Sequence, residues 1–338
     1  MIIRRDNIGD LILTTPLFEA LRRKFPEAYL AVLANSYNCP TVAGNPYLDE
    51  IFAYTKGKHA ESESHVSVYL RRLKLLWQLR RKRFDYVILP NSGFAKRALG
   101  LARWVAPKHI VGFVNDGANG EKIDFAVPHG DGGNLHETED IYRLLEPLGI
   151  SSPIPRLSVV ADQLRVSELL AALPARVCDS QGPLVALHIS ARKEKQRWPV
   201  ERFSELAHRL HAAHAARFLV FWSPGDENNP FHPGDDGKAA RLLAALSDLP
   251  VAPMRTEHLS ELIAGLSLCD AAVLSDGGAM HVAAGLGKPL VCFFGNSSVE
   301  RWHPWGVPYE LLQKPSRDVA DISVDEAVDA FGRLLSRR

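Results

Sequence analysis

Short apolar segments alternate with longer amphipathic segments along most of this chain. The short segments have the length of buried strands, and in the longer ones apolar residues recur every three or four positions, as on one face of a helix. We predict strands at residues 29–34, 50–54, 86–90, 109–113, 184–189, 217–222, 271–275 and 290–294, and helices at residues 11–25, 68–83, 94–105, 136–148 and 324–335. An apolar strand followed by an amphipathic helix, repeated in this way, is typical of doubly wound parallel sheets in an α/β protein.

The alternation is interrupted at residues 149–155, which are rich in Gly, Ser and Pro. Such a stretch is typical of a linker between domains. We therefore predict two domains, each with a doubly wound parallel sheet, at residues 1–152 and 153–322, followed by a helical segment, residues 323–338, that could pack back on the first domain. A further short strand is predicted at residues 2–5, directly after the initiator Met, which leaves open whether part of it lies upstream.

Composition narrows the class of protein. The 338 residues are 46% hydrophobic and 23% charged, as expected for a soluble globular protein, and the formal net charge of +1 argues against a nucleic-acid partner. The four cysteines are scattered without a Cys-x-x-Cys spacing, so we expect them to be reduced. No apolar run approaches the length of a membrane span and no signal-peptide pattern is present, so we expect the protein in the cytoplasm.

The most informative segment follows the predicted strand 271–275. Asp276 stands at the carboxyl end of that strand, and Gly277 and Gly278 allow a sharp turn and a close approach to a ligand before the next helix begins. Ligands of open α/β sheets bind at this end of the strands, where helix amides can hold an anion. The alternative is that Asp276 only caps the helix and His281 packs on its first turn.

Three further segments also place polar groups after strands. Asp10 stands at the start of a helix, either as a capping carboxylate or as an acid that faces a substrate. Residues 188–199 form a basic loop with Ser190 and four cations before a helix, which could neutralise a diphosphate, although a solvated loop is the alternative. Glu227 follows a Gly turn after the strand 217–222, where an acid can bind ribose hydroxyls or lie in a surface turn.

Two strings in the chain resemble glycosyltransferase family 9, the ADP-heptose:lipopolysaccharide heptosyltransferases. One is residues 7–16, Asn-Ile-Gly-Asp-Leu-Ile-Leu-Thr-Thr-Pro, and the other is residues 275–281, Ser-Asp-Gly-Gly-Ala-Met-His. Residues 197–203, Arg-Trp-Pro-Val-Glu-Arg-Phe, and residues 136–140, His-Glu-Thr-Glu-Asp, are similar to family segments at matching places. The resemblance spans essentially the whole chain, with the strings in the expected order.

The resemblance implies a GT-B fold, in which two Rossmann-like domains face a cleft with the acceptor on the first and the nucleotide sugar on the second. It implies inverting transfer of heptose from ADP-heptose to a lipopolysaccharide core or similar glycan, without metal or other cofactor. Asp10 matches the general base. The donor-binding positions that it implies are Ser190, Lys195, Glu227, Asp276, Gly277, Gly278 and His281.

The chain departs from the family pattern at two of these positions. The family commonly has a Lys two residues before the Trp-Pro pair, where this chain has Gln196 between Lys195 and Arg197, so the phosphate-binding cation stays open. A Thr or Ser of the family is replaced by Gly277, which removes one hydroxyl from the donor site.

Residues 69–83 carry seven cations and apolar positions 69, 70, 73, 76 and 77. The apolar stripe could pack on the sheet, as in an ordinary Rossmann helix, and the helix could contact an anionic inner-membrane surface on its cytoplasmic face; both can hold together, with the cations facing lipid. Two other functions stay open: a GT-B enzyme with a different nucleotide sugar, such as another transferase or a sugar-nucleotide 2-epimerase, and a non-catalytic nucleotide- or glycan-binding protein.

Overall fold

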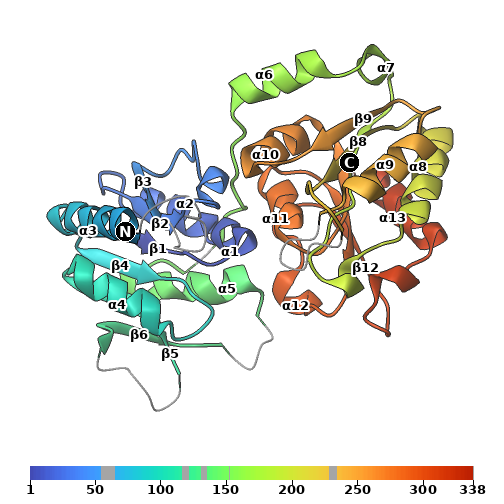
Figure 1. The fold of residues 1–338 in the computed structure, drawn as a ribbon. Coiled ribbons are helices and arrows are strands. Elements are labelled where there is room, and N and C mark those ends of the chain that lie inside the picture. Colours follow the sequence, from blue (N-terminus) through green and yellow to red (C-terminus); the bar gives the residue numbers. More distant parts are fainter. Residues whose placement is uncertain (55–64, 116–121, 131–134, 152, 228–233, 338) are drawn as a thin grey trace. The chain divides into compact units, whose positions relative to one another are not determined.

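The computed structural model describes residues 1–54, 65–115, 122–130, 135–151, 153–227 and 234–337, with the side chains of residues 65–69 not described. The chain divides into two compact units, Met1–Ser158 and Val159–Arg338, each of which contains one parallel sheet with helices on both faces (Figure 1). The predicted domain boundary at residue 152 itself lies outside the described residues.

The sheet of the first unit has six parallel strands in the order β3-β2-β1-β4-β5-β6. Because β1 and β4 are neighbours in the middle, the chain winds in one direction up to β3 and then in the other from β4. The strands are β1 (Ile2–Ile3), β2 (Ala31–Asn35), β3 (Glu50–Tyr54), β4 (Tyr86–Leu89), β5 (His109–Val114) and β6 (Phe125–Pro128).

Two hydrophobic clusters bury the faces of this sheet. Helices α2 (Thr15–Lys24) and α5 (Glu137–Tyr142) contribute to the first cluster, and α3 (His65–Arg81) and α4 (Lys96–Val105) contribute to the second. The consecutive residues Ile2 and Ile3 of β1 lie in different clusters, because successive side chains of a strand point to opposite faces of the sheet. The central strand is therefore covered on both sides.

The predicted helix 11–25 is two helices, α1 (Ile8–Leu13) and α2. Pro16 has no N–H to donate to the carbonyl of Ile12, so the helical ladder is interrupted there. The hydroxyl of Thr15 donates to that carbonyl instead, at 2.7 Å. The predicted helix 136–148 is likewise shorter, because α5 is followed by a 3-10 turn, Arg143–Leu148, that contains Pro147.

The second unit repeats the same winding with the strand order β12-β11-β10-β7-β8-β9, again all parallel. The neighbours at which the winding reverses are β10 and β7. The strands are β7 (Leu184–His188), β8 (Arg217–Trp222), β9 (Val251–Arg255), β10 (Ala271–Ser275), β11 (Leu290–Phe294) and β12 (Tyr309–Gln313).

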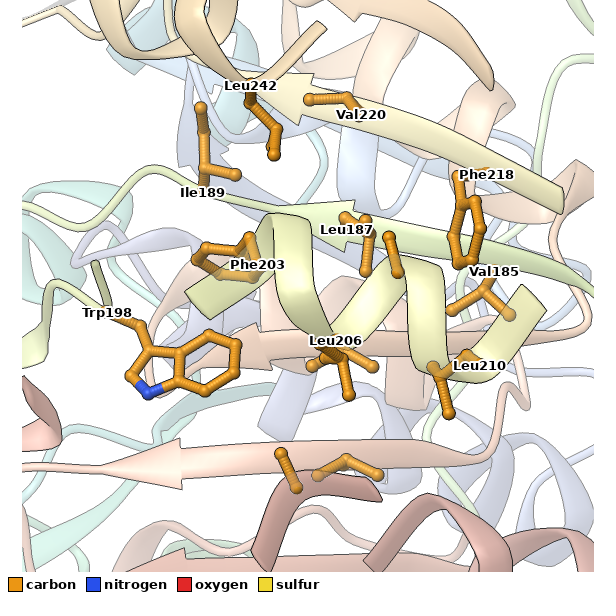
Figure 2. Packing of buried hydrophobic residues seen from close by; sticks show 14 of the residues in the cluster. Val185, Leu187, Ile189, Trp198, Phe203, Leu206, Leu210, Phe218, Val220 and Leu242 are labelled. Carbon is orange, nitrogen blue, oxygen red and sulfur yellow. The ribbon is translucent and has the colours of Figure 1, made fainter. Parts of the chain in front are cut away.

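Helix α8 (Val200–His214) packs on this sheet through Phe203, Leu206 and Leu210, which contact a layer of strand residues such as Leu187 and Phe218 (Figure 2). Trp198 extends this cluster, and its indole N–H donates to the carbonyl of Ile322 at 2.9 Å. Helix α13 (Val324–Ser336) buries its apolar face in the same cluster. The remaining helices are α6 (Gln163–Ala172), α7 (Ala175–Cys178), α9 (Asp236–Ala245), α10 (Leu259–Leu268), α11 (Gly278–Gly285) and α12 (Val299–Trp302).

The apolar stripe expected on the inner face of residues 69–83 lies mostly outside. Leu70, Leu73 and Trp77 are exposed, whereas Leu79 is fully buried against the sheet. The side chain of residue 69 is not described. The inward-packing interpretation is therefore wrong for three of the five apolar positions, because Leu79 and its neighbours fill the inner face. Within the part of the chain that the structure describes, no helix is long and apolar enough to cross a bilayer.

Candidate active site

Each sheet has a point at which its winding reverses, and a ligand crevice is expected outside the carboxyl ends of the strands there. In the first unit the reversal lies between β1 and β4, whose following segments start at Arg4 and residue 90. Side chains from these two segments meet: Asn91 donates to Asp6 at 2.7 Å. The topology therefore brings the segment after β1, which carries Asp6 and Asp10, to the position where substrates of such sheets bind.

Asp10 lies in the first turn of α1, where the sequence predicts it. Its Oδ2 accepts hydrogen bonds from the backbone N–H of Asn7 at 2.9 Å and from the side-chain amide of Asn7 at 2.8 Å. Its Oδ1 lies 3.0 Å from Nη2 of Arg4. The residue is 8% exposed. The capping role is thus real, and it does not exclude a chemical one, because part of the carboxylate remains accessible.

Arg4 is the centre of this cluster, a role that sequence reasoning missed. Its guanidinium is fully buried and contacts three carboxylates, with Nε 3.2 Å from Asp6 and Nη2 3.0 Å from Asp10 and 2.9 Å from Glu137. Ser92 donates to the same oxygen of Glu137 at 2.7 Å. The carboxylates outweigh the effect of burial and raise the pKa of Arg4, so it stays charged.

The charge of Arg4 also decides the protonation of Asp10. Burial raises the pKa of the Asp10 carboxyl, but Arg4 and the hydrogen bonds from Asn7 lower it by more, so the pKa lies below its ordinary value. Asp10 is therefore an ionised acceptor at neutral pH. Its weak intrinsic basicity means that any proton transfer to it depends on precise positioning of the donor group.

In the second unit the winding reverses between β10 and β7, and two of the predicted segments follow those strands. Asp276 comes directly after β10. Its Oδ2 accepts a hydrogen bond from the side-chain amide of Gln196 at 2.8 Å and another from the hydroxyl of Ser297. Gln196 is 7% exposed, whereas Lys195 next to it is exposed. The side chain that contacts Asp276 is therefore the amide of Gln196 and not the neighbouring ammonium of Lys195.

The loop that carries Ser297 is itself fixed by backbone contacts. The amide of Gln313 donates to the carbonyls of Gly295 and Ser297 at 2.8 and 3.1 Å. A Cβ on Gly295 would lie 2.7 Å from the carbonyl oxygen of Lys195, so only glycine lets these two loops approach this closely. Asp276 is thus held by neutral donors from two loops that glycine packs together.

Gly277 and Gly278 form the turn between β10 and α11. Gly277 is the N-cap of α11 and has φ 156° and ψ −170°, a backbone conformation that essentially only glycine adopts. Gly278 begins the helix. His281, on the next turn, is 4% exposed and its ring lies edge-on to Trp302, with 6.4 Å between ring centroids. The predicted Asp-Gly-Gly turn is therefore present, with its helix amides beside Asp276.

Ser190 and Glu227 belong to the neighbouring strand ends. The hydroxyl oxygen of Ser190 accepts a hydrogen bond from the backbone N–H of Ser223 at 2.8 Å, which ties the loop after β7 to the loop after β8. Glu227 lies 3.8 Å from Arg241. Among the described residues, no hydrogen bond joins Glu227 to Asp276 or to its partners Gln196 and Ser297. Glu227 and Asp276 therefore belong to two separate groups of predicted donor residues.

Asp236 organises the ends of β8 and β9, and sequence reasoning missed it. Its carboxylate accepts from the indole N–H of Trp222 at 2.7 Å and from the N–H of Gly225 at 3.0 Å. The hydrogen bond from Trp222 is the main cause that lowers the pKa of Asp236.

At the end of β7, burial lowers the pKa of His188 to about 4, so this ring is neutral at pH 7. Among the residues that the structure describes, no group of three His, Cys, Asp or Glu side chains could hold a metal ion.

Known proteins are similar to this chain over most of its length. A family model described as glycosyltransferase family 9 (heptosyltransferase) matches residues 72–324. Lipopolysaccharide heptosyltransferase 2 of Salmonella typhimurium is 28% identical to the chain over 301 residues, which cover 86% of this chain and 81% of that protein.

Two solved structures share the fold. The Escherichia coli ADP-heptose LPS heptosyltransferase II aligns over 99% of this chain and 98% of its own, with 19% identity and a TM-score of 0.77. The E. coli heptosyltransferase WaaC, solved with ADP, aligns over 98% of both chains with 15% identity and a TM-score of 0.78. With the two six-stranded parallel sheets, these alignments confirm the predicted GT-B fold class.

Proposed function

The chain belongs to glycosyltransferase family 9, and we propose that it transfers a heptose from ADP-heptose to a lipopolysaccharide core acceptor with inversion at the anomeric carbon. A relative of similar length is named a lipopolysaccharide heptosyltransferase, which supports both the sugar and the acceptor. The observation that carries the proposal is the ionised, partly accessible Asp10 at the winding reversal of the first sheet.

Asp10 acts as the general base in this proposal. As the acceptor hydroxyl oxygen forms its bond to the anomeric carbon, its proton passes to the Asp10 carboxylate and the bond between that carbon and the diphosphate oxygen breaks. ADP then leaves with the electron pair, and the attack from the opposite side inverts the configuration. Arg4 and Asn7 hold the carboxylate in one orientation, which supplies the positioning that its low pKa demands.

The second unit binds the donor. Ser190, Lys195 and the first amides of α8 stabilise the negative charge that builds up on the departing diphosphate, an effect larger in the transition state than in the ground state. Asp276, oriented by Gln196 and Ser297, accepts hydrogen bonds from the sugar hydroxyls. Gly277, Gly278 and His281 complete this part of the site, and Glu227 accepts from the ribose. In this proposal the reaction needs no metal or other cofactor, because Lys195 and the first amides of α8 supply the positive charge.

The decisive experiment compares Asp10→Asn, which keeps the size and most hydrogen bonds of the side chain, with Asp276→Ala. We expect Asp10→Asn to lose transfer by at least about a hundredfold, the range in which general base catalysis contributes, and to keep its affinity for ADP. Asp276→Ala should weaken both transfer and binding of ADP-heptose. Near-normal turnover of Asp10→Asn would show that another group removes the proton.

The nucleotide is tested separately. Calorimetric titration with ADP, UDP and GDP should show selective binding of ADP. A preference for UDP or GDP would retain a family 9 transferase and reject ADP-heptose as its donor.

The acceptor proposed here is made on the cytoplasmic face of the inner membrane, so the protein would work in the cytoplasm at that surface.

A further inference from the structure

Helices α3 and α4 carry tryptophans and leucines on their outer faces. Leu70 is 59% exposed, Trp77 is 58% exposed and Trp104, on α4, is 64% exposed. Leu73 is exposed between Leu70 and Trp77. Single exposed apolar residues are common on proteins, but large aromatic side chains gathered on two adjacent helices mark an interaction site.

The two helices adjoin at this surface. A guanidinium nitrogen of Arg80, one turn after Trp77, lies 3.4 Å from the carbonyl oxygen of Trp104, and α3 and α4 pack on the same face of the sheet (Figure 1). Residues 70, 73 and 77 recur at helical spacing, so their side chains leave α3 on one side. We call Leu70, Leu73, Lys74, Trp77, Arg81 and Trp104 the α3–α4 surface.

Positive charge surrounds these apolar side chains. The guanidinium of Arg81 lies over the ring of Trp77, 4.5 Å from its centroid, and Lys74 lies one turn before Trp77 on the helix. The sequences His65–Arg81 and Lys96–Val105 contain no Asp or Glu at all. The ion pairs near these helices among the described residues, Lys82–Glu50 and Lys108–Asp85, involve neither Lys74 nor Arg81. The charge of the surface is therefore available to an anionic partner.

From this combination we infer that the α3–α4 surface docks on a lipid bilayer that contains anionic lipids. Tryptophan and leucine side chains enter the boundary between headgroups and acyl chains, and the cations remain among the phosphates. A second copy of the chain is a poor occupant, because a symmetric contact of this surface with itself would place like charges together. The inference deepens the proposed function, on which it rests for the lipid-borne acceptor.

The test is binding of the full-length protein to vesicles of phosphatidylcholine with and without phosphatidylglycerol, without donor or acceptor. We expect binding only to the anionic vesicles, and loss of it near 1 M salt, where the screening length falls to about 3 Å. Each cation near an anionic surface contributes about a fivefold factor in binding, so Lys74→Glu/Arg81→Glu should weaken it by at least about 25-fold. Because vesicle binding is measured without donor or acceptor, a negative result would reject the membrane inference without testing the proposed transfer reaction.

Two further variants separate insertion from simple charge attraction. Trp77→Ser/Trp104→Ser should reduce binding and abolish quenching of tryptophan fluorescence by lipids brominated in their acyl chains. The matched control is Leu164→Ser/Leu170→Ser, which removes two exposed leucines from α6 and should change neither. All variants should keep the circular dichroism spectrum and the thermal unfolding transition of the parent protein, as a check of folding.

Equal binding to neutral and anionic vesicles would overturn the role of the charge. Unchanged binding of the tryptophan variant, or quenching that persists in it, would overturn insertion through this surface. Absence of binding to any vesicle would reject the membrane as the partner. A change of oligomeric state in the tryptophan variant, measured by light scattering, would assign the surface to contact between protein chains instead.

Discussion

Replacing the buried Arg4–Glu137 pair by amides, Arg4→Gln/Glu137→Gln, should raise the pKa of Asp10. Two unit charges about 4 Å apart interact by about 4 kcal/mol at an effective dielectric constant of 20, which corresponds to about three pKa units. The contact of Arg4 with Asp10 is of this kind, with 3.0 Å between nitrogen and oxygen. Loss of Arg4 alone would therefore raise the pKa of Asp10 strongly, but it would also leave Glu137 buried without a counter-charge.

Removal of Glu137 partly cancels this rise. Its carboxylate and that of Asp10 contact the same nitrogen of Arg4, at 2.9 and 3.0 Å, so their oxygens lie at most about 6 Å apart. At that separation the repulsion is about 3 kcal/mol, or about two pKa units, and it is larger if the oxygens lie closer together. The double variant should thus raise the pKa of Asp10 by at most about one unit, whereas Glu137→Gln alone should lower it. Asp6, the third carboxylate that contacts Arg4, is unchanged in both variants, so its effect on Asp10 is common to the proteins compared.

The assay is a titration of the side-chain carbons of isotope-labelled Asp, with the Asp10 signal assigned from Asp10→Asn. In an enzyme assay, the acid limb of kcat/KM should move to higher pH in the double variant and to lower pH in Glu137→Gln. A structural role alone would not give shifts of opposite sign. If Asp10 titrates at the same pH in all three proteins, the charge of Arg4 does not control its protonation and the reasoning fails.

Three smaller predictions concern the second unit. Gly295→Ala should push the turn of Lys195 away, displace Gln196 from Asp276 and weaken donor binding by about tenfold, because a hydrogen bond to a charged group is lost. Gly332→Ala, on an open face of α13, should leave donor binding unchanged and raise the free energy of unfolding by about 0.5–1 kcal/mol in urea titrations. The hydrogen bond from Lys314 and, to a smaller extent, that from the Ser323 N–H lower the pKa of Glu326 to about 2. The ionised Glu326 therefore stabilises the folded protein fully above its ordinary pKa of 4.5, and this stabilisation is lost as the pH falls towards 2. Glu326→Gln should therefore cost about 0.5 kcal/mol at pH 7 and nothing near pH 2, and a difference that persists in acid would contradict this.

Both candidate acids were predictable from the sequence because their signals are local. Asp276 and Asp10 each follow a strand and stand at the start of a helix, and strand order then places both at the point where the winding reverses. The alternating strands and helices likewise predicted the two parallel sheets. Local patterns failed at helix ends, where single prolines, such as Pro16, decided the outcome.

The partners of these acids were not predictable in the same way. Arg4 and Glu137 are 133 positions apart and meet only because β1 and α5 adjoin in the folded unit. A cation directly after the first apolar strand is the one signal that could have suggested a buried ion pair. Similarly, Gln196 rather than Lys195 points to Asp276, and the phase of a one-turn 3-10 segment cannot be read from its neighbours.

The outward face of α3 shows another limit of periodicity. Apolar residues occupy both sides of this helix, so their spacing cannot indicate which side meets the sheet. Leu79 and its neighbours fill the inner face, and Leu70, Leu73 and Trp77 are left outside. The exposure of these three side chains therefore follows from how α3 packs on the sheet, which the spacing of its apolar residues does not determine.

The most direct test of the whole account is incubation of the protein with ADP-heptose and a purified lipopolysaccharide core acceptor. The product is analysed by mass spectrometry, and its anomeric configuration by NMR. We predict one added heptose per acceptor, one ADP released for each heptose transferred, and an anomeric configuration opposite to that of the donor. Consumption of ADP-heptose without a glycosylated acceptor, or retention of the anomeric configuration, would contradict the account.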